Sequence, residues 1–122
     1  MEAVKEFSAD HEKHFKEAMD ELVASGVDDA FVIFETDEGK FLQFSFSRGE
    51  GLTFDLPRMG LSADERRRVA EVEGMETMDE TEISYLVQIG TDTRMGALLA
   101  HRVFREVFLC PKDYRVEATL EG

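Results

Sequence analysis

Cysteine and proline are scarce in this sequence, and tryptophan and long apolar runs are absent. The single cysteine, Cys110, excludes an internal disulfide, and the two prolines leave no proline-rich linker that would divide the chain. No apolar run approaches the ~20 residues needed to cross a bilayer, and the N-terminus lacks a basic stretch followed by an apolar one. These absences predict a single cytoplasmic domain over residues 1–122, with neither a membrane segment nor a disulfide framework.

Basic residues are also few, because 27 Asp and Glu stand against 14 Lys and Arg and give a net charge of −13. Acidic residues outnumber basic ones in both halves of the chain, which indicates an acidic folded surface rather than an acidic tail. A field of this sign repels phosphate, so we expect no nucleic-acid partner. Two kinds of explanation for the acidity stay open: solubility or adaptation to a salty cytoplasm, and recognition of a basic partner.

The first half of the chain reads as one helix and three strands. Apolar residues recur at helical spacing from Val4 to Leu22, and Gly26 is a natural stop for this helix. Strand patterns follow at 30–34, 42–46 and 52–56, separated by turns that contain glycine. Such short connections predict an antiparallel meander, and the uniformly apolar strand 30–34 is expected to be covered on both faces.

The second half adds two helices and two strands. A helix begins at Ser62, which stands three residues before Glu65 as in a capping box. Further patterns predict a strand over 83–89, a helix over 94–109 and a last strand over 114–120. The predicted fold class is therefore α+β, in the order α-β-β-β-α-β-α-β. It would have a mostly antiparallel sheet of about five strands and helices on one face.

The predicted helix over 94–109 is apolar around more than half of its circumference, which exceeds the stripe needed to cover one sheet face. Either this helix is packed between the sheet and the first helix, or part of it forms a subunit interface. We expect a homodimer, with self-association through the surplus apolar side chains of Leu99, Val103, Phe104, Val107 and Phe108.

The three histidines are the candidates for catalysis or metal binding. His11 and His14 are three residues apart on a helix, which can place two imidazoles on one metal ion, and His101 would have to complete the site. The competing interpretation is a buried His11, hydrogen-bonded to a carbonyl or carboxylate in the apolar stripe. A cleft holding two of the histidines would favour an enzyme, whereas separate positions would exclude it. No nucleotide-binding or nucleophile motif is present, and no cofactor is predicted.

The acidic stretch at 75–82 is the predicted partner-binding segment. Its carboxylates are those of Glu76, Asp79, Glu80 and Glu82. Met75 and Met78 lie in the same stretch, where thioethers would give adaptable apolar contacts or have no role.

The order of the first six predicted elements resembles that of the small acidic chaperones of type III secretion and of related chaperone-like domains. This resemblance covers about two thirds of the chain, rests on no sequence motif and ends where a helix precedes the last strand. It implies a dimer that binds partner polypeptides. Together with the acidic surface, this leads us to expect a non-enzymatic interaction module that binds a basic or amphipathic protein partner. The alternatives are a small hydrolase or metal-dependent enzyme using His11, His14 or His101, and an acidic inhibitor or immunity-type protein that masks a basic active site.

Overall fold

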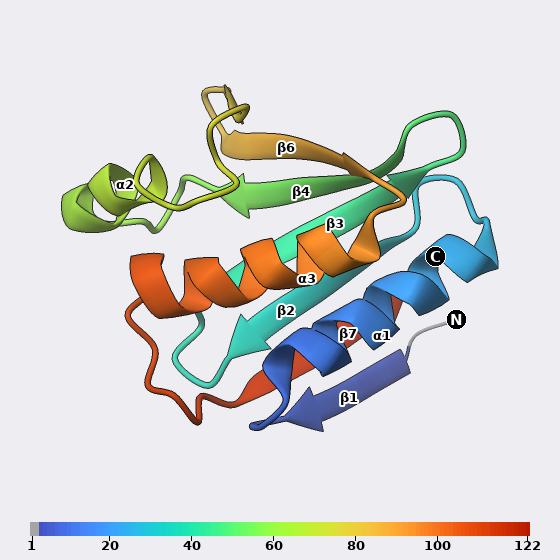
Figure 1. Cartoon of the computed structure of the whole chain (residues 1–122), viewed down its shortest axis with the longest axis horizontal. Helices are drawn as coiled ribbons and strands as arrows, with labels where there is room; N and C mark the ends of the chain where they lie inside the picture. Colours follow the sequence, from blue (N-terminus) through green and yellow to red (C-terminus); the bar gives the residue numbers. More distant parts are fainter. Residues whose placement is uncertain (1–2) are drawn as a thin grey trace.

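A computed structural model describes residues 3–122 as a two-layer α+β fold, in which one antiparallel sheet carries the helices on one face (Figure 1). The strand order is β1-β7-β2-β3-β4-β6-β5. Within the described residues, no helix is both long and apolar enough to cross a membrane. The elements are β1 (Ala3–Phe7), α1 (His11–Ser25), β2 (Phe31–Thr36), β3 (Phe41–Ser47), β4 (Gly51–Pro57), α2 (Ala63–Val69), β5 (Asp79–Glu80), β6 (Ser84–Gly90), α3 (Thr93–Arg102), the π-helical turn η1 (Val103–Val107) and β7 (Val116–Glu121).

The predicted meander is confirmed as strands β2, β3 and β4, which pair antiparallel in succession. Gly39 lies in the turn between β2 and β3 at a φ of 82°, a left-handed conformation that suits glycine. The capping box at the start of α2 is also present, because the Ser62 hydroxyl accepts from the Glu65 amide while the Glu65 carboxylate accepts from the Ser62 amide. Local turn and capping residues therefore determine where the strands of the meander turn and where α2 begins.

The predicted first helix was wrong over its first turn, because residues 3–7 form strand β1 instead. β1 pairs antiparallel with β7 from the other end of the chain, with Phe7 opposite Val116. Asp10 then turns the chain in a left-handed conformation, and α1 begins at His11. Val4 and Phe7 fit a helical stripe as well as a strand, so only the distant pairing with β7 decides between them.

The sheet has seven strands rather than about five. β1 and the two-residue β5 account for the difference, and β5 pairs with β6 at one edge of the sheet. The expectation that strand 30–34 is covered on both faces was wrong. In β2, Val32 and Phe34 are buried under the helices, whereas Ile33 on the opposite face is only partly buried.

Aromatic side chains between the helices and the sheet form the centre of the core. The ring of Phe15 on α1 lies 4.7 Å from that of Phe34 and 5.8 Å from that of Phe104, and all three side chains are fully buried. At Gly96 on α3, an added Cβ would lie 2.9 Å from the Met19 sulfur, so α3 approaches α1 closely. The chain after α2 also packs into this core through Val72 and Met75.

The apolar face of the third helix is used by the core of its own chain. Four of the five residues expected to mediate self-association, Leu99, Val103, Phe104 and Val107, are buried within the chain. Phe108 is partly buried and lies beside Lys40, whose ammonium is 5.8 Å from the ring centre. Because the four buried side chains cannot contact a second copy in this fold, the predicted homodimer would need another surface.

This burial predicts unequal costs for two phenylalanine truncations. Phe104→Ala should lower the free energy of unfolding by about 3–5 kcal/mol, because it leaves a cavity in a closed core. Phe108→Ala should cost clearly less, because its ring is already partly in water. Urea unfolding at two protein concentrations measures both variants. Equal costs for the two variants would contradict the burial of this face within one chain, whereas a wild-type midpoint that rises with concentration would indicate self-association through another surface.

Candidate functional site

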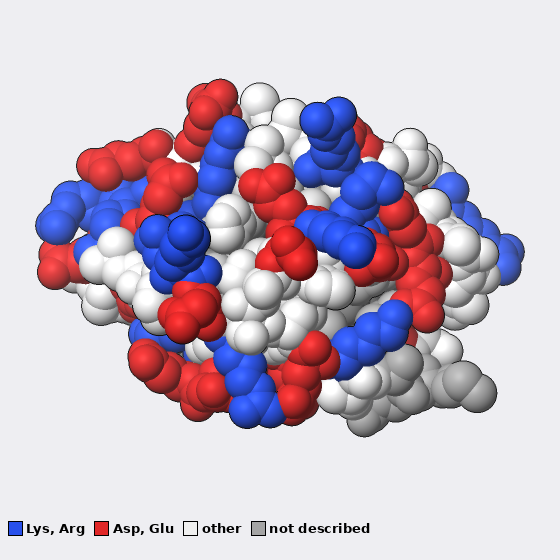
Figure 2. Space-filling view, turned by 60° about the horizontal axis from the view of Figure 1, so that its bottom comes forward, with Lys and Arg blue, Asp and Glu red and all other residues white. Residues whose placement is uncertain are grey.

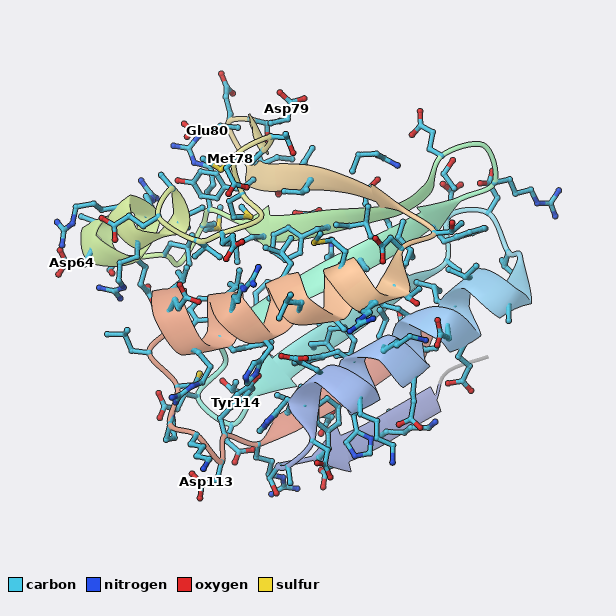
Figure 3. The ribbon with its side chains drawn as sticks, viewed as in Figure 1. Asp64, Met78, Asp79, Glu80, Asp113 and Tyr114 are labelled. Carbon is cyan, nitrogen blue, oxygen red and sulfur yellow. The ribbon has the colours of Figure 1, made fainter. Side chains whose placement is uncertain are left out.

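The acidic segment 76–82 lies at the β5 edge of the sheet. Asp79 and Glu80 form β5, where they pair with Leu86 and Tyr85 of β6. The side chains of both acidic residues are exposed and project from the sheet edge (Figure 3). The side chains of Glu76 and Glu82 are exposed as well, so the segment presents all four predicted carboxylates to solvent.

Arg58 holds this segment against the loop that follows β4. Its backbone amide donates to the Ile83 carbonyl at 2.9 Å, and its Nη1 donates to the Thr81 carbonyl at 2.5 Å. Nη1 also lies 3.6 Å from a carboxylate oxygen of Glu80, while the guanidinium stands 5.5 Å from the centre of the Tyr85 ring. The two loops are therefore fixed to each other by one side chain and one main-chain hydrogen bond.

Two apolar side chains on the loops that Arg58 joins are strongly exposed to solvent. Met59 is 89% exposed, Ile83 is 76% exposed, and the bond from Arg58 to Ile83 joins the loops that carry them. Sequence reasoning missed both, because Ile83 continues the alternation of β6 and Met59 stands in a short turn. We call Met59, Ile83 and the carboxylates of Glu76, Asp79, Glu80 and Glu82 the acidic edge patch.

The histidines occupy two different places. His11 and His101 line one cleft of about 1000 Å³ at the start of α1, together with Arg105, Lys112 and Asp113. His14 is not among the lining residues of this cleft and pairs instead with Glu17, at 3.0 Å between Nδ1 and the carboxylate. The cleft thus brings together two of the three histidines that the sequence singled out.

The rings of Tyr114, His11 and His101 stack beside this cleft. Tyr114 lies in the loop before β7 and close to the helices (Figure 3), with its ring 3.9 Å from that of His11 and 5.8 Å from that of His101. His11 Nε2 lies 2.7 Å from the Tyr114 carbonyl, so this nitrogen carries the proton and donates. The Tyr114 hydroxyl lies 2.8 Å from His101 Nδ1.

Burial shifts the pKa values of His101 and Tyr114. It lowers the pKa of His101, and the neighbouring His11 lowers it further, whereas it raises the pKa of the Tyr114 hydroxyl. Tyr114 therefore keeps its proton, and its hydroxyl shares a hydrogen bond with Nδ1 of neutral His101. Each histidine thus uses one nitrogen for a structural hydrogen bond. Among residues 3–122, no three His, Cys, Asp or Glu side chains are placed to hold a metal ion.

Cys110 lies near the cleft but has the properties of a structural thiol. It is partly buried, and burial together with the charge of Glu38 raises its pKa. A thiol that stays protonated is a poor nucleophile.

The second face of the sheet carries no helix, because the described helices pack on the other one (Figure 1). We call it the helix-free face. Its apolar members Phe31, Ile33, Phe41 and Leu86 are partly buried. The charged residues at strand positions on this face are all acidic: Glu6, Glu35, Asp55, Asp79, Glu117 and Glu121.

The distribution of charge differs around the molecule. On the side shown in Figure 2, acidic and basic side chains alternate with uncharged ones, and no large region of one sign forms. The helix-free face differs because its strands supply carboxylates without Lys or Arg. Alternation along each strand shows in the sequence which acidic residues of that strand share a face. Which acidic residues of different strands share a face is known only once the register between strands is known.

Comparison of this chain with protein-family models, curated proteins and solved structures finds no match.

The lowered pKa of His101 predicts an acid-sensitive fold. The unfolded chain takes up this proton at the ordinary pKa of 6.5, whereas the folded chain takes it up only at lower pH. The contribution to the free energy of unfolding is therefore complete above pH 6.5 and is lost as the pH falls from that value through the lower pKa of the folded chain. Urea unfolding at about pH 7.5 and about pH 5.5 should show a smaller fall for His101→Gln than for the wild type. An equal fall in both proteins would show that His101 does not cause it.

Proposed function

We propose that this chain is a non-enzymatic protein-interaction module that binds a basic or amphipathic protein partner through its acidic surface. The observation that supports this function is the acidic edge patch, in which Met59 and Ile83 stand exposed on two joined loops. Exposed apolar side chains rimmed by charged ones are typical of protein-binding surfaces.

The two kinds of side chain in the patch have different effects on binding. Covering Met59 and Ile83 removes apolar area from water, which contributes roughly 25 cal/mol per Å². The carboxylates of Asp79, Glu80 and Glu82 attract a basic partner and repel an acidic one, so they raise the association rate and the specificity. An acidic inhibitor or immunity-type protein would use the same surface and would differ only in its partner.

A small hydrolase or metal-dependent enzyme is the second candidate function, and one observation favours it. His11 and His101 line a single cleft beside Arg105 and Lys112. The His11 nitrogen bound to the Tyr114 carbonyl argues against a role as general base, because that atom already donates its proton to the main chain. Hydrolysis of an activated ester that is abolished in His101→Ala, while the fold is retained, would favour this enzyme over the interaction module.

A synthetic helix of leucine and lysine, with the two types on opposite faces, tests the interaction module. The wild type should bind this peptide, and Met59→Ser combined with Ile83→Ser should weaken binding about tenfold, because a partner would bury both side chains. Isothermal titration calorimetry gives the dissociation constants.

Met95→Ser combined with Leu109→Ser is the matched control, because these side chains are 45% and 61% exposed and lie outside the patch. This control should bind like the wild type. A wild type that does not bind the peptide would refute the proposed function, and equal weakening in both double variants would remove the patch as its site.

A further inference from the structure

The strand register aligns one row of side chains across the helix-free face. Ile33 on β2 stands opposite Gln43 on β3, Gln43 opposite Asp55 on β4, and Asp55 opposite Leu86 on β6. Leu86 in turn stands opposite Asp79 on β5, which belongs to the acidic edge patch. The patch and the helix-free face therefore form one continuous surface.

A second row consists of carboxylates on three neighbouring strands. Glu6, Glu117 and Glu35 stand directly opposite one another on β1, β7 and β2. Like charges in such positions repel and destabilise a sheet. Arg115 pairs with Glu6, but within residues 3–122 neither Glu35 nor Glu117 forms an ion pair. Two exposed carboxylates thus remain without an ion pair, although the charge of Glu117 still acts on nearby Arg115, whose pKa it helps to raise.

Asp55 adds an unsatisfied acceptor near the centre of the face. Its Oδ2 accepts a hydrogen bond from Gln43 Nε2 at 3.0 Å. Its Oδ1 is shielded from solvent and has no donor among the described residues. A shielded carboxylate oxygen without a donor is costly, and a cation bound at the surface above this carboxylate would offset part of that cost by its charge.

We propose that the helix-free face binds a basic amphipathic helix of the partner polypeptide, laid across the strands; this inference rests on the proposed function. The apolar side chains of the helix contact Ile33, Phe41 and Leu86. Its Lys or Arg side chains lie over Glu35 and Glu117 at one end and over Asp55 and Asp79 toward the other.

The geometry of the rows suits a helix better than an extended segment. Neighbouring strands are about 4.8 Å apart, close to the ~5–6 Å between helix side chains three or four residues apart. Together the two rows extend over six neighbouring strands from β7 to β5, or about 24 Å, which a helix of about 16 residues spans. A helix satisfies its own main-chain hydrogen bonds, whereas an extended segment lying on the face would leave them without partners.

The negative charge of the helix-free face also favours a basic helix over other occupants of this face. A second copy of this chain would bring the carboxylates of Glu35 and Glu117 against carboxylates, so self-association through this face is opposed by repulsion. Nucleic acids and anionic membranes are repelled for the same reason.

Calorimetric titration with a leucine and lysine helix of about 16 residues tests this inference. Glu35→Gln combined with Glu117→Gln should weaken binding about fivefold and reduce its salt dependence. Glu50→Gln combined with Glu106→Gln is the matched control, because it changes the net charge equally at exposed positions outside the face. Ile33→Ser should weaken binding by a further factor of about five. A scrambled peptide of equal composition should bind at least tenfold more weakly.

The outcomes separate this inference from the proposed function. If Glu35→Gln with Glu117→Gln and its control Glu50→Gln with Glu106→Gln give equal dissociation constants, the helix-free face is overturned as the binding surface. The proposed function still stands in that case if Met59→Ser with Ile83→Ser weakens binding. Equal binding of the scrambled peptide would overturn the helical partner. No binding of either peptide by the wild type would overturn both the inference and the proposed function.

Discussion

The packing of α1 and α3 against a single face of the sheet is the constraint on which the rest of the structure depends. The rings of Phe15, Phe34 and Phe104 join both helices to the sheet, and Gly96 allows α3 to lie close to α1. This packing consumes the apolar surface of the third helix. It also leaves the opposite face of the sheet without a second layer, although that face carries partly buried apolar side chains.

The elements that depend on local chemistry could be predicted from the sequence, and those that depend on distant pairing could not. The turn at Gly39, the capping box at Ser62 and the Asp92 cap of α3 each involve residues a few positions apart. β1 forms only because β7 lies beside it, and a strand of two residues such as β5 has no periodicity to detect. The sheet therefore has more strands than the pattern indicated.

The candidate sites show the same difference between features visible in the residue types and features that depend on the folded chain. The sequence identified the carboxylates of segment 76–82 and the histidines, because their chemistry is visible in the residue types. It did not identify Met59 and Ile83 as exposed, nor Glu35 and Glu117 as neighbours, because exposure and register depend on the folded chain. His11 and His101 meet through Tyr114, which no spacing in the sequence could show.

Taken together, the acidic edge patch and the helix-free face give the chain one acidic, partly apolar surface, while the histidine cleft lies at the start of α1. Amide chemical shifts of the labelled protein, followed by NMR while a spin-labelled leucine and lysine helix is added, test this account most directly. The account predicts the strongest line broadening on β7, β2, β3, β4 and β6 and in segment 76–83, with weaker broadening on α1 and α3, which lie one layer farther from the bound helix. Broadening confined to the helices or to the cleft beside His101 would contradict it.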